Sequence, residues 1–451
     1  MKNQFLADLQ WRGLIADCTD LAGLSTRMDQ GPVSVYCGFD PTAQSLHVGS
    51  LIPLLGLARF QQVGHRALAL VGGATGLIGD PSGKSVERNL QTEAEVYVRA
   101  QLINAQLAKF VDIGDDSRGK VVDNLSWTQS ITMLEFMRDV GKHFSVNAMI
   151  SRDSIKSRLE REGEGISFTE FSYMLLQAND FLKLHELEGC SVQIGGSDQW
   201  GNMCSGADLI RRKHGAAAFA LTFPLLTTSD GQKFGKTVKG AVWLDKELTS
   251  IWDFYQFWLN TDDKDVVRFL KMFTFIGREE IEALAQSTLN EPHARLAQRR
   301  LAAAMTVLVH GEPATDECLD TAAVLFRQAD PKTLSTTSFE SLASSLPVVE
   351  LPTIELPTLA RLLVLAGLET STTRAAEAIR SGAVAVNGEK CFNPLEQLQV
   401  MDALHGRWYL IRKGKKSFAL AALPESFAEA FAVEVLGGVD AAETSARSVD
   451  A

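Results

Sequence analysis

Apolar and polar positions along the first 245 residues predict short buried strands separated by helices. Four runs of apolar, β-prone residues stand out, at residues 33–39, 67–71, 191–194 and 220–226. Segments with apolar residues at helical spacing, such as residues 51–60, separate most of them. This arrangement is typical of βαβ units and a mainly parallel α/β sheet. Ligands bind at the carboxyl ends of such strands, so we expect the polar motifs that follow the runs to share one site.

The pattern changes after residue 245, where helical periodicity takes over. We divide the remainder into a helical domain at residues 246–330, a linker rich in Ser, Thr and Pro at 331–356, a compact module at 357–424 and a disordered tail at 437–451. We expect the aromatic cluster at residues 253–260 to form helix–helix core rather than an exposed stacking platform. The compact module combines two amphipathic helices with a strand that enters a hairpin at Asn387-Gly388.

Composition narrows the class of protein. The 451 residues are 45% hydrophobic, enough for several folded domains, and carry a formal net charge of −11. The negative net charge of the protein argues against non-specific nucleic-acid binding by its entire surface, so any contact with nucleic acid must use local basic patches. The six cysteines include no Cys-x-x-Cys pair, which favours a reducing compartment. Without a secretory leader or a membrane-spanning apolar run, we expect a soluble cytoplasmic protein.

The segment from Tyr36 to Ser50 joins the first strand to the first helix and organises the rest. It reads Tyr-Cys-Gly-Phe-Asp-Pro-Thr-Ala-Gln-Ser-Leu-His-Val-Gly-Ser. It places His47 at a helix start, where unpaired N–H groups and the helix dipole favour a phosphate. This segment resembles the HIGH-type motif of the class I aminoacyl-tRNA synthetases. Its first seven residues narrow the resemblance to the bacterial-type tyrosyl-tRNA synthetases.

The second run is followed by a glycine-rich segment at residues 72–85. The pattern argues against a P-loop, because Gly79 and Gly83 enclose three residues instead of four and because Pro81 lacks the N–H that a phosphate would need. The glycines are better explained by a tight turn that lets backbone approach a ligand. Asp80 then fits either a partner for a ligand ammonium group or a turn cap.

A long helix is predicted between a capping box at residues 167–170 and a stop at Gly189. Tyr173, Gln177 and Asp180 lie four and three residues apart, which puts them on one face of that helix. A narrow polar stripe among apolar residues either faces water or lines a pocket. The resemblance favours the pocket.

Two further motifs follow later strands. Residues 193–202 contain Gly-Gly-Ser-Asp-Gln, in which paired glycines allow close backbone approach and Asp198 can accept from a ribose hydroxyl; a plain connecting turn is the alternative. Residues 233–237 read Lys-Phe-Gly-Lys-Thr. Such a lysine pair is commonly solvated surface, but here it resembles the KMSKS-type motif of class I synthetases. The first motif departs from the family because Ser50 stands where many members have a second histidine.

The resemblance implies a role for each motif residue. Tyr36 and Asp180 would meet the phenolic hydroxyl of tyrosine, selecting it by a hydrogen bond that phenylalanine cannot make, for which these synthetases are a standard example. The full tyrosine-binding set would be Tyr36, Asp80, Tyr173, Gln177, Asp180, Gln193 and Gln199. The ATP-binding set would be Cys37, Gly38, Asp40, His47, Gly49, Ser50, Gly196, Asp198, Lys233, Lys236 and Thr237. The catalytic set, which stabilises the charge of the reacting phosphate, would be Thr42, His47, Lys233 and Lys236.

The implied activity is that of a tyrosine–tRNA ligase, which makes tyrosyl-adenylate and pyrophosphate and then transfers the tyrosyl group to the 3′-terminal ribose of tRNA(Tyr). The expected co-substrate is ATP with Mg²⁺, with no tightly bound cofactor, no metal site, no DNA or membrane partner, and a homodimer as in the family. The expected fold is a Rossmann-like catalytic domain at residues 1–245, then the helical domain, then a small α+β RNA-binding domain.

Basic residues mark the expected RNA contacts, although a solvated basic face remains the alternative. In the last module they are Arg374, Arg380, Arg412, Lys413, Lys415 and Lys416. The basic run between residues 142 and 161 fits either a solvated helix face or a tRNA acceptor stem. Two other functions stay open: a catalytically silent RNA-binding paralogue, which His47 and both lysines argue against, and a tryptophan-specific synthetase, which Tyr36 with Asp180 argues against.

Overall fold

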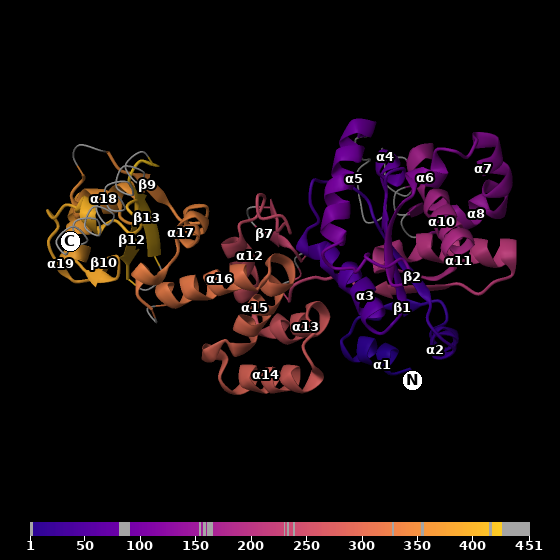
Figure 1. The fold of residues 1–451 in the computed structure, drawn as a ribbon, viewed down its shortest axis with the longest axis horizontal. Coiled ribbons are helices and arrows are strands. Elements are labelled where there is room, and N and C mark those ends of the chain that lie inside the picture. Colours follow the sequence, from indigo (N-terminus) through magenta and orange to yellow (C-terminus); the bar gives the residue numbers. More distant parts are fainter. Residues whose placement is uncertain are drawn as a thin grey trace, which may run out of the picture. The chain divides into compact units, whose positions relative to one another are not determined.

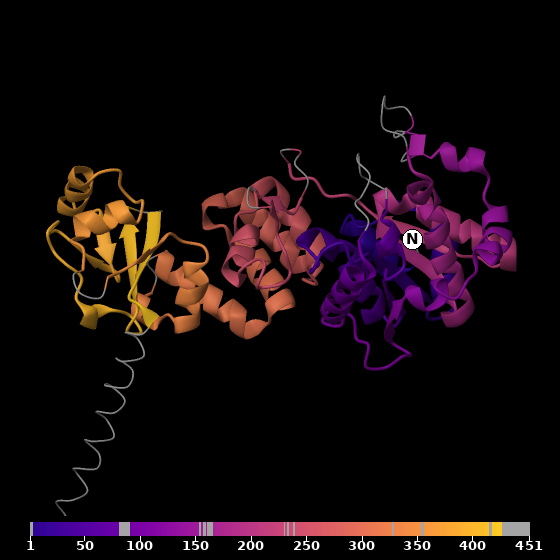
Figure 2. The same cartoon turned by 90° about the horizontal axis from the view of Figure 1, so that it is seen from above.

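The computed structural model describes residues 3–80, 91–152, 155–156, 159, 166–229, 231, 234–237, 240–326, 329–352, 356–414 and 417–425. The chain forms two compact units (Figures 1 and 2). The first unit comprises Met1–Thr249 and Leu259–Leu301, and the second comprises Ser250–Trp258 and Ala302–Ala451. Among the described residues, no helix is both long enough and apolar enough to cross a membrane.

The first unit is built around a six-stranded sheet of order β1-β6-β5-β2-β3-β4. Its strands are β1 (Asp17–Cys18), β2 (Ser34–Phe39), β3 (Arg66–Val71), β4 (Gly119–Asp123), β5 (Cys190–Gly196) and β6 (Phe219–Phe223). All neighbours are parallel except β1, which pairs antiparallel with β6. The chain runs outward from β2 to β4 and then crosses back to β5 on the other side of β2. The strand order therefore reverses between β2 and β5, where α/β sheets bind ligands.

Helices cover both faces of this sheet. The helices of this part of the unit are α1 (Gln4–Trp11), α2 (Leu21–Asp29), η1 (Val48–Ser50), α3 (Leu51–Gln62), α4 (Thr75–Ile78), α5 (Glu93–Leu107), α6 (Leu125–Thr128), α7 (Met133–Asp139), η2 (Gly141–His143), α8 (Val146–Ile150), α10 (Phe168–Glu188), η3 (Ser197–Gln199) and α11 (Trp200–His214). Figure 1 shows α3 and α5 on one side of the sheet and α10 and α11 on the other. As predicted, Ser167 caps α10 by accepting from the N–H of Glu170, and Gly189 ends it at φ 64°.

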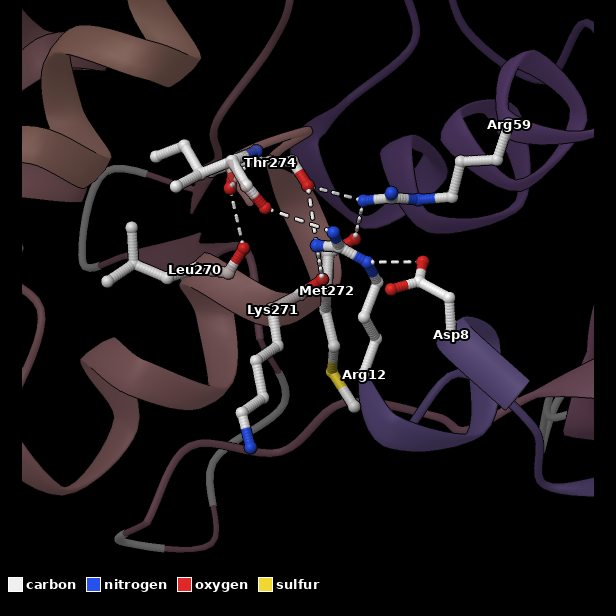
Figure 3. Close-up of polar contacts among 8 residues, drawn as sticks. Asp8, Arg12, Arg59, Leu270, Lys271, Met272 and Thr274 are labelled. Atoms are coloured by element: carbon white, nitrogen blue, oxygen red, sulfur yellow. Dashed lines mark hydrogen bonds and ion pairs between the residues drawn. The ribbon is translucent and has the colours of Figure 1, made fainter. Parts of the chain in front are cut away.

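The rest of the first unit contains β7 (Lys236–Thr237), β8 (Gly240–Ala241), α13 (Asp263–Phe273), α14 (Arg278–Asn290) and η4 (Pro292–Ala294). The carbonyl groups at the end of α13 are held by two arginines from distant elements, as Figure 3 shows. Arg59 of α3 donates to Thr274 O at 2.5 Å, and Arg12 donates to Thr274 O at 3.2 Å and Ile276 O at 3.0 Å. Burial, with the nearby Arg12 charge, lowers the pKa of Arg59 to about 9, so it stays a cation that suits a helix C-terminus.

The second unit contains a bundle of helices and a small sheet of order β11-β10-β12-β13-β9. Its elements are α12 (Ile251–Leu259, of which Leu259 belongs to the first unit), the part of α15 (Leu296–His310) that follows Leu301, α16 (Glu312–Leu325), η5 (Pro331–Thr333), α17 (Thr336–Ala343), β9 (Val348–Glu350), α18 (Leu359–Leu365), α19 (Thr372–Arg380), β10 (Val384–Val386), β11 (Glu389–Lys390), η6 (Val400–Asp402), β12 (Trp408–Lys413) and β13 (Ser417–Ala422). The α12 aromatics Phe254, Tyr255 and Trp258 are buried, which confirms the core interpretation. The hairpin at Asn387-Gly388 is also confirmed, with positive φ at both residues.

Several elements differ from the prediction. The sheet has two strands that the sequence pattern did not reveal, β1 and β4. Strand β6 ends at Phe223 instead of Leu226, because Pro224 offers no N–H to continue the ladder. Residues 331–356, expected to be a linker, contain α17 and the strand β9, whose neighbour β13 supplies the pairing that local composition cannot reveal. The predicted disordered tail lies outside the described residues.

Candidate active site

A cleft of about 610 Å³ opens where the strand order reverses. It lies at the carboxyl ends of β2 and β5, beside the starts of α3 and η3 and one face of α10. Most of the predicted tyrosine, ATP and catalytic residues line it: Tyr36, Cys37, Gly38, Asp40, Thr42, His47, Gly49, Ser50, Asp80, Tyr173, Gln177, Asp180, Gln193, Gly196, Asp198 and Gln199. The sequence motifs therefore converge in one place, and the stripe on α10 faces a pocket instead of water.

The two predicted lysines are described less completely. Lys233 lies outside the described residues, and Lys236 and Thr237 are placed only by their backbone, in β7. The backbone between the lysines nevertheless reaches the cleft, because Phe234 is among its lining residues.

The buried end of the cleft presents a hydroxyl that lacks a partner. Tyr36 is 1% exposed, and its Oη has no hydrogen-bond partner among the described residues. Burial raises the pKa of Tyr36 well above its usual value, and the charge of Asp180 raises it further, so the hydroxyl stays protonated. An unpartnered buried hydroxyl carries a desolvation cost that a bound polar group would remove.

Asp180 is held beside this hydroxyl by two donors from the segment after β4. Trp127 Nε1 donates to Asp180 Oδ1 at 2.8 Å, and Asn124 Nδ2 donates to Oδ2 at 2.9 Å. Burial raises the pKa of Asp180 to about 7, and these two hydrogen bonds oppose the rise. Asn124 is itself fully buried and fixed, because its Oδ1 accepts from the Ala74 N–H at 2.7 Å.

A second carboxylate, Asp40, is half-buried and joins the same network through Thr75, whose Oγ1 accepts from Asn124 Nδ2 at 3.0 Å. Tyr173 donates to Asp40 Oδ2 at 2.6 Å, and Thr75 Oγ1 donates to Asp40 Oδ1 at 2.7 Å. Burial and then the Asp40 charge raise the pKa of Tyr173, which keeps its hydroxyl a donor. Gly72 makes this approach possible, because a Cβ there would collide with Asp40 Oδ1 and Thr75 Oγ1. The site is thus rich in negative charge and suits a ligand cation.

Amides form a third cluster near Asp80. Gln199 Nε2 donates to Asp80 Oδ2 at 2.6 Å, and Asn202 Nδ2 donates to Gln177 Oε1 at 2.9 Å. Gln193, 2% exposed on β5, has an Oε1 with no hydrogen-bond partner among the described residues. This end of the cleft therefore offers amide acceptors as well as carboxylates to a bound amine.

The opposite, open end carries the His47 motif. His47 directly precedes η1 and is exposed, and its backbone forms an isolated antiparallel β-bridge with that of Trp243. A Cβ on Gly49 would lie 2.8 Å from His47 Cε1, so the imidazole would have to shift from this position over the backbone if Gly49 carried a side chain. Cys37 is buried, and burial raises the pKa of its thiol to about 12, so it is not a nucleophile.

Asn124, Trp127 and Thr75 are site residues that the sequence reasoning missed. Asn124 and Trp127 follow β4, a strand that was not predicted, so the rule about carboxyl ends of strands was never applied to them. Thr75 lies inside the glycine-rich segment but has a side chain that only the fold brings to Asp40.

The predicted RNA-binding residues are spread over the last module. Arg374 and Arg380 are exposed on α19, and Arg412 is half-buried in β12. Lys413 forms an ion pair with Glu369 at 2.7 Å, so its positive charge is already balanced by a carboxylate. Lys415 and Lys416 lie outside the described residues. Among the described residues, no group of three or more His, Cys, Asp or Glu side chains could hold a metal ion.

Two family models match the chain. One, described as tRNA synthetases class I (W and Y), covers residues 28–327, and one described as Tyrosine--tRNA ligase SYY-like C-terminal domain covers residues 338–421. A tyrosine–tRNA ligase of Geobacillus kaustophilus is 50% identical over 92% of this chain and 98% of its own length. One of Mycobacterium bovis is 48% identical over 93% and 99%. The crystal structure of a C-terminally truncated mitochondrial tyrosyl-tRNA synthetase of Aspergillus nidulans matches with a TM-score of 0.65 and 34% identity, over 72% of this chain and 95% of that one.

Proposed function

The chain belongs to the tyrosine–tRNA ligases of class I, and from that premise we propose how its own residues select tyrosine, activate it with ATP and pass it to tRNA(Tyr). The observation that carries the proposal is the Tyr36 hydroxyl, buried without a hydrogen-bond partner among the described residues beside the carboxylate of Asp180. A phenolic hydroxyl fits between them, since it accepts from Tyr36 and donates to Asp180. Phenylalanine would leave the buried Tyr36 hydroxyl unpaired and would add no donor to Asp180, which then keeps only its hydrogen bonds from Trp127 and Asn124.

The amino group of tyrosine is assigned to the acidic and amide cluster at the other side of the pocket. Asp80 and Gln177 offer acceptors to an ammonium group, and Tyr173 adds its phenolic oxygen. Gln199 holds Asp80 in place through a 2.6 Å hydrogen bond. Gln193 lies on β5 and has a buried amide oxygen with no partner among the described residues. A donor on the substrate would satisfy this oxygen.

Activation requires the tyrosine carboxylate to attack the α-phosphate of ATP while pyrophosphate leaves. Thr42, His47, Lys233 and Lys236 are proposed to stabilise the negative charge that spreads over the phosphates. Asp198 and the glycine backbone at Gly196 are proposed to hold the ribose. The ribose of tRNA(Tyr) then attacks the tyrosyl-adenylate, with AMP as the leaving group.

Magnesium is proposed to arrive bound to the ATP phosphates. The donor set of the cleft fits this assignment, because three of its carboxylates, Asp40, Asp80 and Asp180, are engaged by protein donors and no three carboxylate, His or Cys side chains among the described residues converge as a ligand cage. Mg²⁺ commonly keeps several of its waters and binds through substrate phosphates. The ion would supply charge neutralisation on the phosphates.

A homodimer is supported by exposed apolar side chains on neighbouring helices of the first unit. Met133 and Leu134 of α7 are 72% and 84% exposed, and Phe168 at the start of α10 is 68% exposed. Exposed apolar clusters of this kind are typical of protein interfaces. Sedimentation of Leu134→Glu should give a lighter species than the wild type, whereas Leu289→Glu, on an equally exposed leucine of α14, should not change the mass.

The deciding experiment is amino-acid-dependent ATP–pyrophosphate exchange with tyrosine, phenylalanine and tryptophan. Exchange with tyrosine alone is the expected result. Exchange driven by tryptophan would refute the pocket assignment, and no exchange from folded protein with Mg²⁺ present would favour a silent RNA-binding paralogue. Tyr36→Phe should keep the fold but weaken the preference for tyrosine over phenylalanine. A cytoplasmic location is part of the proposal, because tRNA charging serves translation there.

A further inference from the structure

The segment that carries the two lysines is tied to helix α13 by contacts that begin before the first lysine. The backbone N–H of Ser229 donates to Asp265 Oδ2 at 2.8 Å, and Arg268 Nη2 donates to Thr227 O at 2.5 Å. Asp265 and Arg268 also pair with each other at 2.8 Å. Asp265 is only 4% exposed, whereas the Arg268 side chain is 40% exposed, so the carboxylate end of this charge-assisted network is withdrawn from water and holds the backbone at residues 227–229.

The residue between the lysines docks on the same helix. Phe234 is 7% exposed, and its ring centroid lies 4.8 Å from that of Phe269 and 5.1 Å from that of Phe273. Asp265, Phe269 and Phe273 are four residues apart, so one face of α13 receives both the start and the middle of the segment.

Gly235 joins this segment to the His47 motif. Its φ is +82°, and a Cβ there would lie 2.8 Å from Val48 Cγ2. Its carbonyl accepts from Val242 N at 3.1 Å, and the carbonyl of Val242 accepts from Val48 N at 2.9 Å. The backbone next to Lys236 is therefore in register with the backbone next to His47.

The far end of α13 is attached to the helix that starts at the same motif. Arg59, near the end of α3, donates to Thr274 O, and Arg12, the residue that follows α1, donates beside it (Figure 3). Helix α13 thus contacts the lysine segment with one part and the helix of the His47 motif with the other.

We propose that Asp265, paired with Arg268, is a positioning residue for the adenylation step: it sets the backbone path that presents Lys236 to the ATP phosphates. This rests on the role proposed above for Lys236. Asp265 itself contacts no substrate in this scheme and acts through Ser229. Stabilisation of a reacting phosphate depends steeply on distance, and a shift of about 1 Å can cost on the order of 10²-fold in rate.

The test is steady-state ATP–pyrophosphate exchange by full-length Asp265→Ala, Asp265→Asn and Arg268→Ala, with Lys264→Ala as the control. Lys264 is exposed on the same helix, one residue away. Asp265→Ala should lower kcat about tenfold or more and leave the KM for tyrosine within about twofold, because the tyrosine pocket lies elsewhere. Asp265→Asn keeps an acceptor for the Ser229 N–H and should recover part of the rate. Lys264→Ala should match the wild type.

Three results would overturn the inference. One is an Asp265→Ala enzyme as fast as Lys264→Ala, another is a KM for tyrosine that rises in proportion to the loss of rate, and the third is an Asp265→Asn enzyme no faster than Asp265→Ala. Should Asp265→Ala fail to fold, Arg268→Ala takes its place, because it removes the donor to Thr227 O and the partner of Asp265. Its kcat should fall relative to Lys264→Ala without a proportional rise in the KM for tyrosine, and a kcat equal to that of Lys264→Ala would overturn the inference. A wild-type protein without tyrosine-dependent exchange would instead refute the proposed function, so the two failures are distinguishable.

Discussion

Tyrosine affinity should depend on pH through Asp180. Burial raises the pKa of this carboxyl to about 7. In the protein without bound tyrosine, the Asp180 side chain therefore loses its negative charge as the pH falls through 7. Above that value the carboxylate accepts a hydrogen bond from the tyrosine hydroxyl as an anion, and below it as a neutral acid. The affinity for tyrosine should therefore be highest above pH 7 and fall below it.

The size of the effect follows from the difference between the two kinds of hydrogen bond. A bond to a charged group contributes about 1.5–3 kcal/mol and a neutral one about 0.5–1.5 kcal/mol. A difference of about 1 kcal/mol or slightly more corresponds to a limiting five- to tenfold change in Kd, and because about a tenth of Asp180 remains in the other form at pH 6 and at pH 8, the Kd should be roughly three- to fivefold larger at pH 6 than at pH 8. Asn124→Ala removes one donor to the charged form, which should move the midpoint upward by about one pH unit or more.

Equilibrium dialysis of labelled tyrosine without ATP, from pH 5.5 to 8.5 at constant ionic strength, measures this directly. Asn290→Ala removes an exposed asparagine from α14 and serves as the control, with folding checked by circular dichroism at each pH. A Kd that is flat across the range, or a midpoint that does not move in Asn124→Ala, would refute the reasoning that Asp180 titrates in contact with the hydroxyl.

Three other outcomes follow from single contacts. Gly72→Ala should destabilise the protein by about 1–3 kcal/mol in urea unfolding and raise the Kd for tyrosine, because the new Cβ meets Asp40 and Thr75; unchanged values would contradict the close approach. Cys37, with a thiol pKa of about 12, should resist iodoacetamide at pH 8 in the folded protein and react once it is unfolded, as mass spectrometry can show. Arg59→Ala should lower the melting temperature, since buried carbonyls at the end of α13 lose a charged donor worth about 1.5–3 kcal/mol; an unchanged melting temperature would mean that water replaces it.

The sequence was most informative where a rule links a residue type to a backbone position. A polar residue after a buried strand, as at Asp40 or Asp198, could be assigned to the cleft because parallel strands end at one edge. The stripe on α10 followed from helical spacing alone. Its direction, toward a pocket instead of water, needed the family resemblance.

The residues that were missed depend on contacts between distant segments. Strand β4 reads Gly-Lys-Val-Val-Asp, with only two apolar residues, and gains its place by pairing with β3. Without that strand, Asn124 was one more polar residue in a loop. Its value to the site comes from an Asp180 carboxylate 56 residues away, a separation that no local pattern contains.

Strand β9 limits where the chain can be cut. Its residues Val348–Glu350 lie parallel to β13, the N–H of Leu351 donates to Ala422 O, and the Leu351 side chain is 3% exposed in the core of the small sheet. A fragment that began at residue 357 would leave the edge of β13 unpaired, and such an exposed edge can pair with a strand of another molecule. Expression of the C-terminal module by itself should therefore start upstream of Pro347, so that the fragment brings its own edge strand and stays monomeric.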